Sequence, residues 1–332
     1  MNNNSLTIIA EIGSIHDGSI GNAIKAIDAA SEAGADIVKF QTHIAEAESL
    51  SSAPSPNYFS NESRIDYFRR TAFNFNEWLK ISEHCKLKNV KFLSSPFSLE
   101  AVDLLEKVGV DAYKIPSGEV TNLPLLERIA KTSKSVYLSS GMSNWHELDN
   151  AVNILKNCSK LIPMQCTSSY PCKPEMVGIN IIKQMMDRYD LEVGFSDHTL
   201  GFAAAISAVS LGSTVIEKHF TFSKLMYGSD AANSMEPHEF KVFCSSLREA
   251  AIIRDNKIDK DNLDAFKEMK KIFEKSIVTS LDLKKGKQLC ENDIAYKKPG
   301  DGISAAFYKE VIGKILKRDL PKDVKISWDD LT

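Results

Sequence analysis

The sequence predicts a (β/α)8 TIM barrel, an α/β fold, followed by a small β-rich domain. Short β-rich apolar segments alternate with longer segments of helical period over the first 256 residues, which is typical of parallel β/α units. The expected strands span residues 6–10, 37–40, 91–93, 112–115, 135–138, 161–165, 192–195 and 214–217. Eight strand–helix units within about 255 residues indicate this barrel, whereas a doubly wound sheet, the alternative, rarely has eight such regular units.

The expected helices are amphipathic, and several end near a glycine. They span residues 23–32, 76–87, 99–108, 123–131, 145–155, 179–189, 202–211 and 237–253. Gly34, Gly109 and Gly212 lie where a left-handed C-cap belongs. The longest interruption, residues 46–70, is rich in Ser, Pro and Asn and predicts an extended loop, which either lies over the functional site or is a mobile surface insertion.

The last part of the chain differs in kind from the barrel. Residues 257–275 are lysine-rich and predict a linker with a short amphipathic helix. Residues 276–332 contain an internal repeat, because DLKKGKQLCENDI at 282–294 matches DLPKDVKISWDDL at 319–331 in Asp, Leu, Lys and apolar positions. We therefore expect a barrel at 1–256, a linker at 257–275 and a two-fold-like domain at 276–332.

Composition excludes several classes of protein. Lys plus Arg is 41 and Asp plus Glu is 44, so the net charge of −3 predicts no general attraction to nucleic acid or anionic membrane. No apolar run reaches the ~18 residues of a membrane span, and the start MNNNSLTIIAEIG lacks the features of a signal peptide. The six cysteines are scattered without a CxxC pair, which favours buried thiols in a reducing cytosol. A cytoplasmic enzyme is expected.

Functional groups in a barrel follow the carboxyl ends of the strands. At these positions the sequence has Glu11, His16, Asp17, Lys39, Gln41, Ser94, Ser95, Lys114, Ser117, Glu119, Ser139, Ser140, CTSSYP at 166–171, Ser196, Asp197, His198, Lys218 and His219. Two lysines among serines and glycines suit a phosphate or carboxylate group, because ammonium groups supply charge and hydroxyls and backbone amides supply donors. No Walker motif is present and no GxGxxG follows the first strand, so a nucleotide-binding loop is not expected.

Two histidines end neighbouring strands, the seventh and the eighth. His198 and His219 can converge on one divalent cation, with water and substrate completing its shell. The alternative for each is a hydrogen-bonded structural role. His43 follows the second strand and belongs either to a loop or to the site.

Three carboxylates are candidates for acid–base chemistry. Glu11 and Glu119 are expected to face the mouth of the barrel, where burial can raise the pKa of a carboxyl group toward values useful for acid–base catalysis. Each can instead simply pair with Lys39 or Lys114. Asp230, in YGSDAANSM beyond the eighth strand, is the third, and spacing alone does not rank them.

These residues lie in sequence blocks that together resemble the N-acetylneuraminate (sialic acid) synthase family, including SpsE-like, legionaminate and pseudaminate synthases. The blocks are AEIGSIHDGSIGNAIKAIDAASEAGADIVKFQTH, FLSSPFS, YKIPSGEVTNLPLL, LSSGMS, MQCTSSYP, VGFSDHTLG and IEKHFT. The resemblance continues through KKPGDGIS and VIGKIL into a C-terminal antifreeze-like (SAF) capping domain, so it covers nearly the whole chain.

The resemblance implies a reaction and a set of roles. Members condense phosphoenolpyruvate with an N-acylated amino sugar, such as N-acetylmannosamine or a 2,4-diacetamido-trideoxyhexose, giving a nine-carbon 2-keto sugar acid and phosphate for surface polysaccharides. It implies that phosphoenolpyruvate is held by Lys39, Ser95, Lys114, Ser117, Ser139, Ser168 and Ser196. His198 and His219 would bind a divalent metal, Mn²⁺ first, with Mg²⁺ or Co²⁺ as alternatives. The residues facing the sugar would be Glu11, Gln41, Tyr170, Asp230 and, in a domain-swapped homodimer, Lys298 of the partner subunit. Glu119, with Glu11, would be catalytic.

Two positions depart from the family pattern. Ser168 stands where sialate synthases commonly have Asn, and Lys298 stands where they usually have Arg. A lysine cannot reproduce the planar bidentate donor of arginine, so the second departure bears on the identity of the sugar more than on the reaction. The alternatives are a related keto-acid synthase or barrel aldolase acting on another sugar, and a non-catalytic carbohydrate-binding relative.

Overall fold

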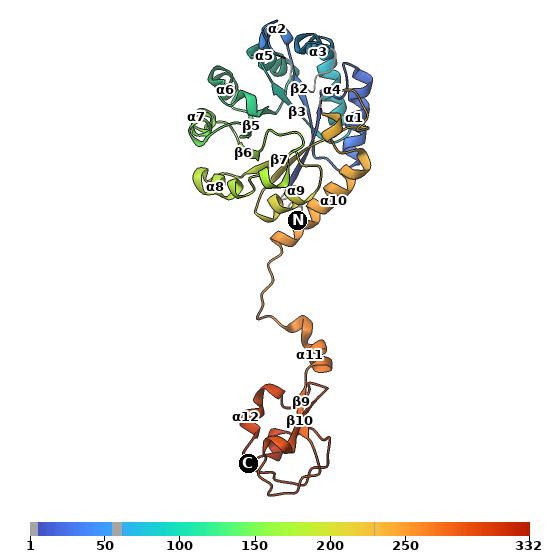
Figure 1. Ribbon diagram of the computed structural model, residues 1–332, viewed down its shortest axis with the longest axis vertical. Coiled ribbons are helices and arrows are strands. Elements are labelled where there is room, and N and C mark those ends of the chain that lie inside the picture. The colour runs from blue at the N-terminus through green and yellow to red at the C-terminus, as the bar shows by residue number, and fades with distance from the viewer. Residues whose placement is uncertain (1–5, 55–61, 229) are drawn as a thin grey trace. The chain divides into compact units, whose positions relative to one another are not determined.

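The computed structural model describes residues 6–54, 62–228 and 230–332, and the chain divides into two compact units, Met1–Asn256 and Lys257–Thr332. In the first unit, eight parallel strands close a barrel in chain order, which confirms the predicted fold class (Figure 1). The strands are β1 Thr7–Gly13, β2 Ile37–Thr42, β3 Lys91–Pro96, β4 Ala112–Ile115, β5 Ser135–Ser139, β6 Leu161–Cys166, β7 Gly194–Asp197 and β8 Val215–His219. No helix among the described residues is long and apolar enough to cross a membrane.

A helix completes each of the eight strand–helix units and lies outside the strands (Figure 1). These helices are α1 Ile20–Glu32, α4 Phe75–Leu87, α5 Leu99–Val108, α6 Leu123–Ala130, α7 Trp145–Leu155, α8 Asn180–Tyr189, α9 Ala203–Ser210 and α10 Pro237–Asp255. Side chains fix several of their starts: Ser19 caps α1 by accepting from the Asn22 N–H, so α1 begins three residues earlier than its apolar period indicates. After α5, Gly109 has φ 85°, the left-handed conformation expected of a glycine C-cap.

The segment after β2 is not wholly a loop, so the prediction for residues 46–70 is wrong in part. Helix α2 spans Ala45–Glu48 and α3 spans Arg64–Thr71. Ser63 caps α3 by accepting a hydrogen bond from the Asp66 N–H at 3.2 Å, a local signal that the surrounding Ser, Pro and Asn residues obscure. Residues 55–61 of the predicted loop lie outside the described residues.

The alternation of side-chain directions along the strands determines which residues face the barrel interior. Successive side chains of a strand point to opposite faces, so every second residue points inward. One inward layer is apolar and packs into a single cluster, formed by Ile9, Ile37, Leu93, Ile162, Met164 and Val215. Two positions after Ile9, Ile37, Leu93, Met164 and Val215, toward the carboxyl ends, lie the polar or ionisable residues Glu11, Lys39, Ser95, Cys166 and Glu217. A polar layer therefore rests on an apolar floor.

In the second unit, the sequence repeat corresponds to a structural one. The main chains of Leu283 and Leu320 exchange hydrogen bonds of 2.8 and 2.9 Å. The Asp319 carboxylate accepts from the Lys285 N–H at 2.8 Å. At the equivalent positions of the other repeat, the Asp282 carboxylate accepts from the Lys322 N–H, also at 2.8 Å. The unit also contains α11 Lys267–Phe273, β9 Ser276–Thr279, β10 Ile294–Lys297 and α12 Tyr308–Val311. Its division into linker and domain stays a prediction.

Candidate functional site

A cavity of about 430 Å³ opens at the carboxyl ends of the barrel strands. Most residues predicted from strand ends line it, namely Glu11, Lys39, Gln41, Lys114, Ser117, Ser139, Ser168, Tyr170, Ser196, His198, His219 and Asp230. Ser95 and Glu119, to which the resemblance assigns roles, do not line it, and neither do the strand-end residues His16, Asp17, Ser94, Ser140, Asp197 and Lys218. Residues that follow strands in different parts of the first unit therefore line one cavity.

Both lysines at the base of the cavity are paired with buried carboxylates. The Lys39 ammonium lies 2.9 Å from Glu11 Oε2 and 3.5 Å from Glu217 Oε1, and Lys114 Nζ lies 2.8 Å from Glu217 Oε2. Burial alone would lower the pKa of Lys39, but Glu11 and Glu217 outweigh it and raise that pKa. Burial would raise the pKa of Glu217, and the two ammonium groups outweigh it and lower that pKa. The base of the site is thus a buried network of alternating charges.

Glu217 is a functional candidate that the strand-end reading missed. It bridges both lysines and lies within 3.5 Å of the Ser196 hydroxyl. A signal was present, because Glu217 precedes His219 by two positions on β8 and period-two alternation points both side chains inward. The predicted pairing of Glu11 with a lysine is also seen, since Glu11 contacts Lys39.

Hydroxyl groups and one backbone amide form a second part of the cavity. The Gly141 N–H donates to Ser117 Oγ at 3.1 Å, and Cys166 Sγ lies 3.4 Å from the same hydroxyl. A β-carbon on Gly141 would lie 2.5 Å from Ser168 Oγ and 2.7 Å from both Ser117 Oγ and Cys166 Sγ. Only glycine allows this close approach, and the resulting group of donors suits the oxygens of an anion. Burial raises the pKa of the Cys166 thiol, so Cys166 serves there as a neutral wall.

The two strand-end histidines lie beside each other, with ring centroids 5.6 Å apart. His198 Nδ1 donates to the Thr167 carbonyl at 2.8 Å, which leaves its Nε2 lone pair free for another partner. Burial, and then the neighbouring His219, lowers the pKa of His198 to about 3, so this ring is neutral. His219 Nδ1 lies 3.8 Å from Asp230 Oδ2, and the Tyr170 ring packs 4.2 Å from His198.

This arrangement fits a divalent metal. An oriented neutral imidazole, hydrogen-bonded to a backbone carbonyl, is the usual form of a metal-binding histidine. Within the part of the chain that the structure describes, no group of three or more His, Cys, Asp or Glu side chains is arranged to hold a metal. His198 and His219 would therefore supply two ligands, and water and substrate the others, as in catalytic sites with open positions.

A buried ion pair behind the barrel wall holds the turn that follows β7. Lys218 Nζ lies 2.8 Å from Asp197 Oδ2 and also donates to the carbonyls of Thr199 and, at 3.5 Å, Gly201. The Thr199 N–H donates to the other Asp197 oxygen at 2.8 Å. Since His198 lies inside this turn, the Lys218 ammonium helps to fix the position of His198.

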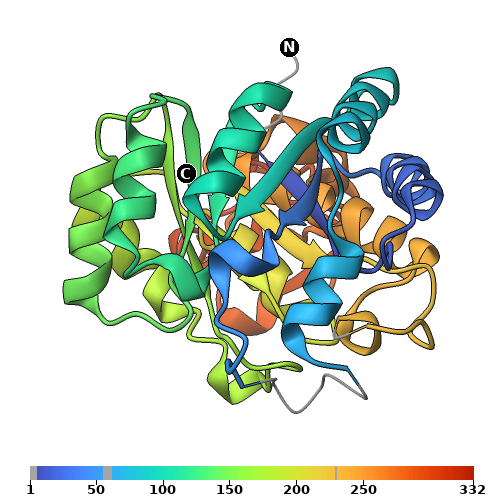
Figure 2. The same cartoon turned by 90° about the horizontal axis from the view of Figure 1, so that it is seen from above.

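One wall of the cavity comes from the segment after β2. Arg64, Tyr67 and Phe68 of α3 line it, together with His43 and Phe97. Figure 2 shows α2 and α3, in darker and lighter blue, beside each other in front of the barrel strands. The α3 residues were missed because their helix was taken for loop, whereas His43, left open by the sequence, belongs to the site.

Ser95, Glu119 and Lys298, to which the resemblance assigns roles, have distinct surroundings. Ser95 is buried and accepts a hydrogen bond from Lys39 at 3.3 Å. Glu119 ends the turn Ser117–Glu119 and accepts from Asn122 at 2.7 Å; burial raises its pKa, against the lowering effect of the Asn122 hydrogen bond. Lys298 belongs to the second unit, with its ammonium 4.9 Å from the Phe273 ring centroid. The catalytic or binding roles of all three stay predictions.

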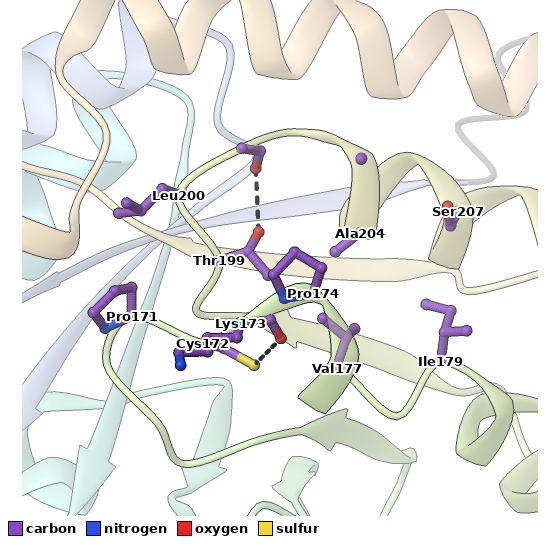
Figure 3. Close-up of a pocket in the computed structure, with 12 residues that line it drawn as sticks. Pro171, Cys172, Lys173, Pro174, Val177, Ile179, Thr199, Leu200, Ala204 and Ser207 are labelled. Carbon is purple, nitrogen blue, oxygen red and sulfur yellow. Dashed lines mark hydrogen bonds between the residues drawn. The ribbon is translucent and has the colours of Figure 1, made fainter.

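A second cavity, of about 470 Å³, lies between residues 171–179 and 199–207 (Figure 3). Its walls are mainly apolar, with Pro171, Pro174, Val177, Ile179 and Ala204 among them. Of the described residues that line it, Lys173 alone is charged, and the Cys172 thiol donates to the Lys173 carbonyl at 3.5 Å. Without a carboxylate or histidine in its lining, this cavity lacks the acid–base and metal-binding groups of the first, despite its larger volume.

Models of known protein families match both units of the chain. The model described as "NeuB family" matches residues 26–259, and the SAF domain model matches residues 274–332. The chain is 38% identical over 325 residues to the N,N′-diacetyllegionaminic acid synthase of Campylobacter jejuni, covering 95% of this chain and 97% of that protein.

Two solved structures are also similar. The N-acetylneuraminic acid (sialic acid) synthetase of Leptospira borgpetersenii, crystallised with citrate, has a TM-score of 0.71 at 29% identity, covering 81% of this chain and 93% of that one. The spore coat polysaccharide biosynthesis protein SpsE of Bacillus subtilis has a TM-score of 0.66 at 29% identity, covering 98% of this chain and 95% of that one.

Proposed function

Because the chain belongs to the NeuB family, and so is a phosphoenolpyruvate-dependent condensing enzyme, we propose that it joins phosphoenolpyruvate to an N-acylated amino sugar and releases phosphate. The product is a nine-carbon 2-keto sugar acid. The main support is one cavity that places two buried ammonium groups and several hydroxyls beside a pair of histidines. The first acceptor to consider is a 2,4-diacetamido-trideoxyhexose, since the 38% identical relative is an N,N′-diacetyllegionaminic acid synthase, with N-acetylmannosamine as the alternative.

Phosphoenolpyruvate fits the anion-binding side of the cavity. Lys39 and Lys114 supply charge, and Ser117, Ser168 and the Gly141 N–H supply fixed donors for phosphate or carboxylate oxygens. Because the two ammonium groups are already paired with Glu11 and Glu217, the substrate exchanges with these carboxylates rather than entering an uncompensated positive site. Such an exchange keeps the lysines charged before and after binding.

The condensation then needs one C–C bond and one water. The methylene carbon of phosphoenolpyruvate bonds to the aldehyde carbon of the open-chain sugar, and the aldehyde oxygen takes a proton. Water adds to the phosphate-bearing carbon and loses one proton, which gives a tetrahedral hemiketal phosphate. The C–O bond to phosphate then breaks as the remaining hydroxyl proton leaves, which gives the 2-keto acid and phosphate. We assign Glu119 the main share in stabilising the transient positive charge and moving the protons, and Glu11 the binding of sugar hydroxyls.

His198 and His219 would hold the metal ion, with Mn²⁺ ahead of Mg²⁺ and Co²⁺. Such an ion supplies Lewis-acid polarisation of the sugar aldehyde when it is bound. The hydrogen bond from His198 Nδ1 to the Thr167 carbonyl keeps Nε2 as the ligating atom, and Asp230 lies beside His219 on the sugar side.

A domain-swapped homodimer, in which Lys298 of the partner subunit reaches the sugar, is part of the same proposal. Lysine offers a single point charge in place of a bidentate fork, so its contact with an N-acyl oxygen is weaker and less directional than that of arginine. We propose a surface polysaccharide as the destination of the product, which the similarity to SpsE supports.

The test is a panel of acceptors incubated with phosphoenolpyruvate and Mn²⁺, with phosphate release as the readout. Release with an unphosphorylated N-acyl amino sugar, and not with sugar phosphates, is expected. Release only with sugar phosphates would instead indicate a keto-acid synthase of the shorter-sugar type. No release with any aldehyde would leave a non-catalytic carbohydrate-binding protein and refute the proposal.

A further inference from the structure

His43 lies in an unusually complete set of contacts for a residue outside the polar layer. Its ring is nearly parallel to those of Phe68 and Phe97, at centroid distances of 3.7 and 4.2 Å and interplanar angles of 18° and 19°. Nδ1 lies 2.8 and 3.0 Å from the two carboxylate oxygens of Glu48, and Nε2 lies 3.1 Å from Gln41 Oε1. The side chains of His43 and Glu48 are only 5% and 3% exposed.

The hydrogen-bond directions follow from the neighbouring charges. Glu11 contacts the Lys39 ammonium at 2.9 Å, so it is a charged acceptor, and it takes a hydrogen bond of 2.7 Å from the Gln41 side-chain nitrogen. The Gln41 oxygen therefore faces His43. Turning the amide over would put its oxygen against the Glu11 carboxylate and lose the 2.7 Å hydrogen bond.

Both nitrogens of the His43 ring thus face oxygens, Nδ1 the Glu48 carboxylate and Nε2 the Gln41 amide oxygen. The ring is held by the Glu48 carboxylate at one edge and by the parallel Phe68 and Phe97 rings at its faces. Glu48 belongs to α2 and Phe68 to α3. The segment after β2 therefore fixes the His43 ring, which in turn contacts Gln41.

We propose that His43 is a positioning residue: clamped by Glu48, Phe68 and Phe97, it fixes the Gln41 amide toward Glu11 and leaves the second Gln41 N–H for an oxygen of the acceptor sugar. The inference rests on the proposed function, which places Gln41 and Glu11 at the sugar. It makes the segment after β2 a determinant of acceptor affinity, without contact between His43 and the reacting atoms.

The variant His43→Phe tests this, because phenylalanine keeps the stack between Phe68 and Phe97 and removes both ring nitrogens. The KM for the amino sugar is expected to rise about tenfold, which corresponds to about 1.4 kcal/mol of binding, while the KM for phosphoenolpyruvate stays within twofold. Glu48→Gln is the conservative variant: it keeps a hydrogen-bonding partner at Nδ1, so the ring stays beside Gln41 and the sugar KM is expected to stay within threefold. His84→Phe is the matched control, since His84 also bonds a carboxylate, Asp28 at 2.8 Å, but lies outside the cavity.

A second readout does not depend on turnover. The Gln41 side-chain amide, assigned in a ¹⁵N–¹H spectrum by its loss in Gln41→Glu, is expected to exchange with solvent faster in His43→Phe than in the unsubstituted protein. An unchanged sugar KM, an equal rise in both KM values, a Glu48→Gln effect as large as that of His43→Phe, or unchanged exchange would each overturn the inference. If no acceptor supports turnover in the unsubstituted protein, the proposed function fails, and the exchange measurement still decides the role of His43.

Discussion

Replacing Glu217 with Gln removes the one carboxylate that contacts both buried lysines. Glu217 lies 2.8 Å from Lys114 and 3.5 Å from Lys39, and its side chain is 6% exposed. Lys39 keeps Glu11 as a partner in the variant, but Lys114 loses the carboxylate that contacts it. Glutamine preserves the shape of the side chain, so the loss is one of charge rather than of packing.

The expected cost follows from burial. Breaking a buried ion pair by removing one partner costs about 3–5 kcal/mol, because the remaining charge is left without compensation. For a unit of this size each kcal/mol lowers the melting temperature by about 2–4 °C, so Glu217→Gln is expected to melt roughly 6–20 °C below the unsubstituted protein. The control is Glu192→Gln, whose partner Lys160 lies 3.0 Å away with both side chains about half exposed. Such a surface pair is worth about 1 kcal/mol or less.

The pH dependence gives a second check of the same reasoning. The folded-state pKa of Glu217 is lowered from its ordinary 4.5, so its contribution is fully present above that pH and is lost as the pH falls toward the folded-state value. Thermal melting of both proteins between pH 7.5 and pH 3 is therefore expected to show a difference that is largest at neutral pH and narrows in acid. A melting temperature within 2 °C of the unsubstituted protein at pH 7.5, or a gap that does not narrow in acid, would refute the account of the charged base.

Three further expectations concern turnover and metal binding. Glu119→Gln is expected to lower kcat by about 10²–10⁴ with circular dichroism unchanged, and near-normal turnover would remove Glu119 from its catalytic assignment. Gly141→Ala is expected to raise the KM for phosphoenolpyruvate at least tenfold, because the added methyl group would meet Ser168 Oγ at 2.5 Å; Gly21→Ala on α1, where the nearest atom is 3.7 Å away, is the control. The double variant Lys218→Met/Asp197→Asn removes the buried pair without leaving a lone charge. It is expected to loosen the turn around His198 and so to weaken Mn²⁺ binding, measured by calorimetry. Unchanged Mn²⁺ affinity would show that the pair serves stability alone.

The sequence predicts the barrel and most of the cavity lining because both depend on short periods. Alternation along β2 and β4 points Lys39 and Lys114 inward, and the strand-end rule brings them together without any knowledge of distance. Alternation along β8 points Glu217 inward in the same way, but the strand-end rule took Lys218 and His219 as the residues that end this strand. The pairing of Glu217 with Lys114, 103 positions away, follows only when closure of the barrel brings β8 beside β1. The wall from α3 was missed for another reason: Ser63 is a sound N-cap, but turn-forming residues dominate the sequence before it.

The charge balance of the cavity explains why the lysines alone are a poor guide to how the site binds. Two unpaired ammonium groups buried at the base of a barrel would each cost several kcal/mol, so a fold that keeps them needs carboxylates beside them before any substrate arrives. Glu11 and Glu217 meet that need, and they make the base a balanced network. A trianionic substrate can then form ion pairs with the lysines only by replacing the ion pairs that they already form with these carboxylates. Its affinity must rest largely on neutral donors, the hydroxyls and the Gly141 N–H, which have no charged partner to give up. For this reason a single methyl group at Gly141 is expected to weaken phosphoenolpyruvate binding even though it leaves both lysines in place.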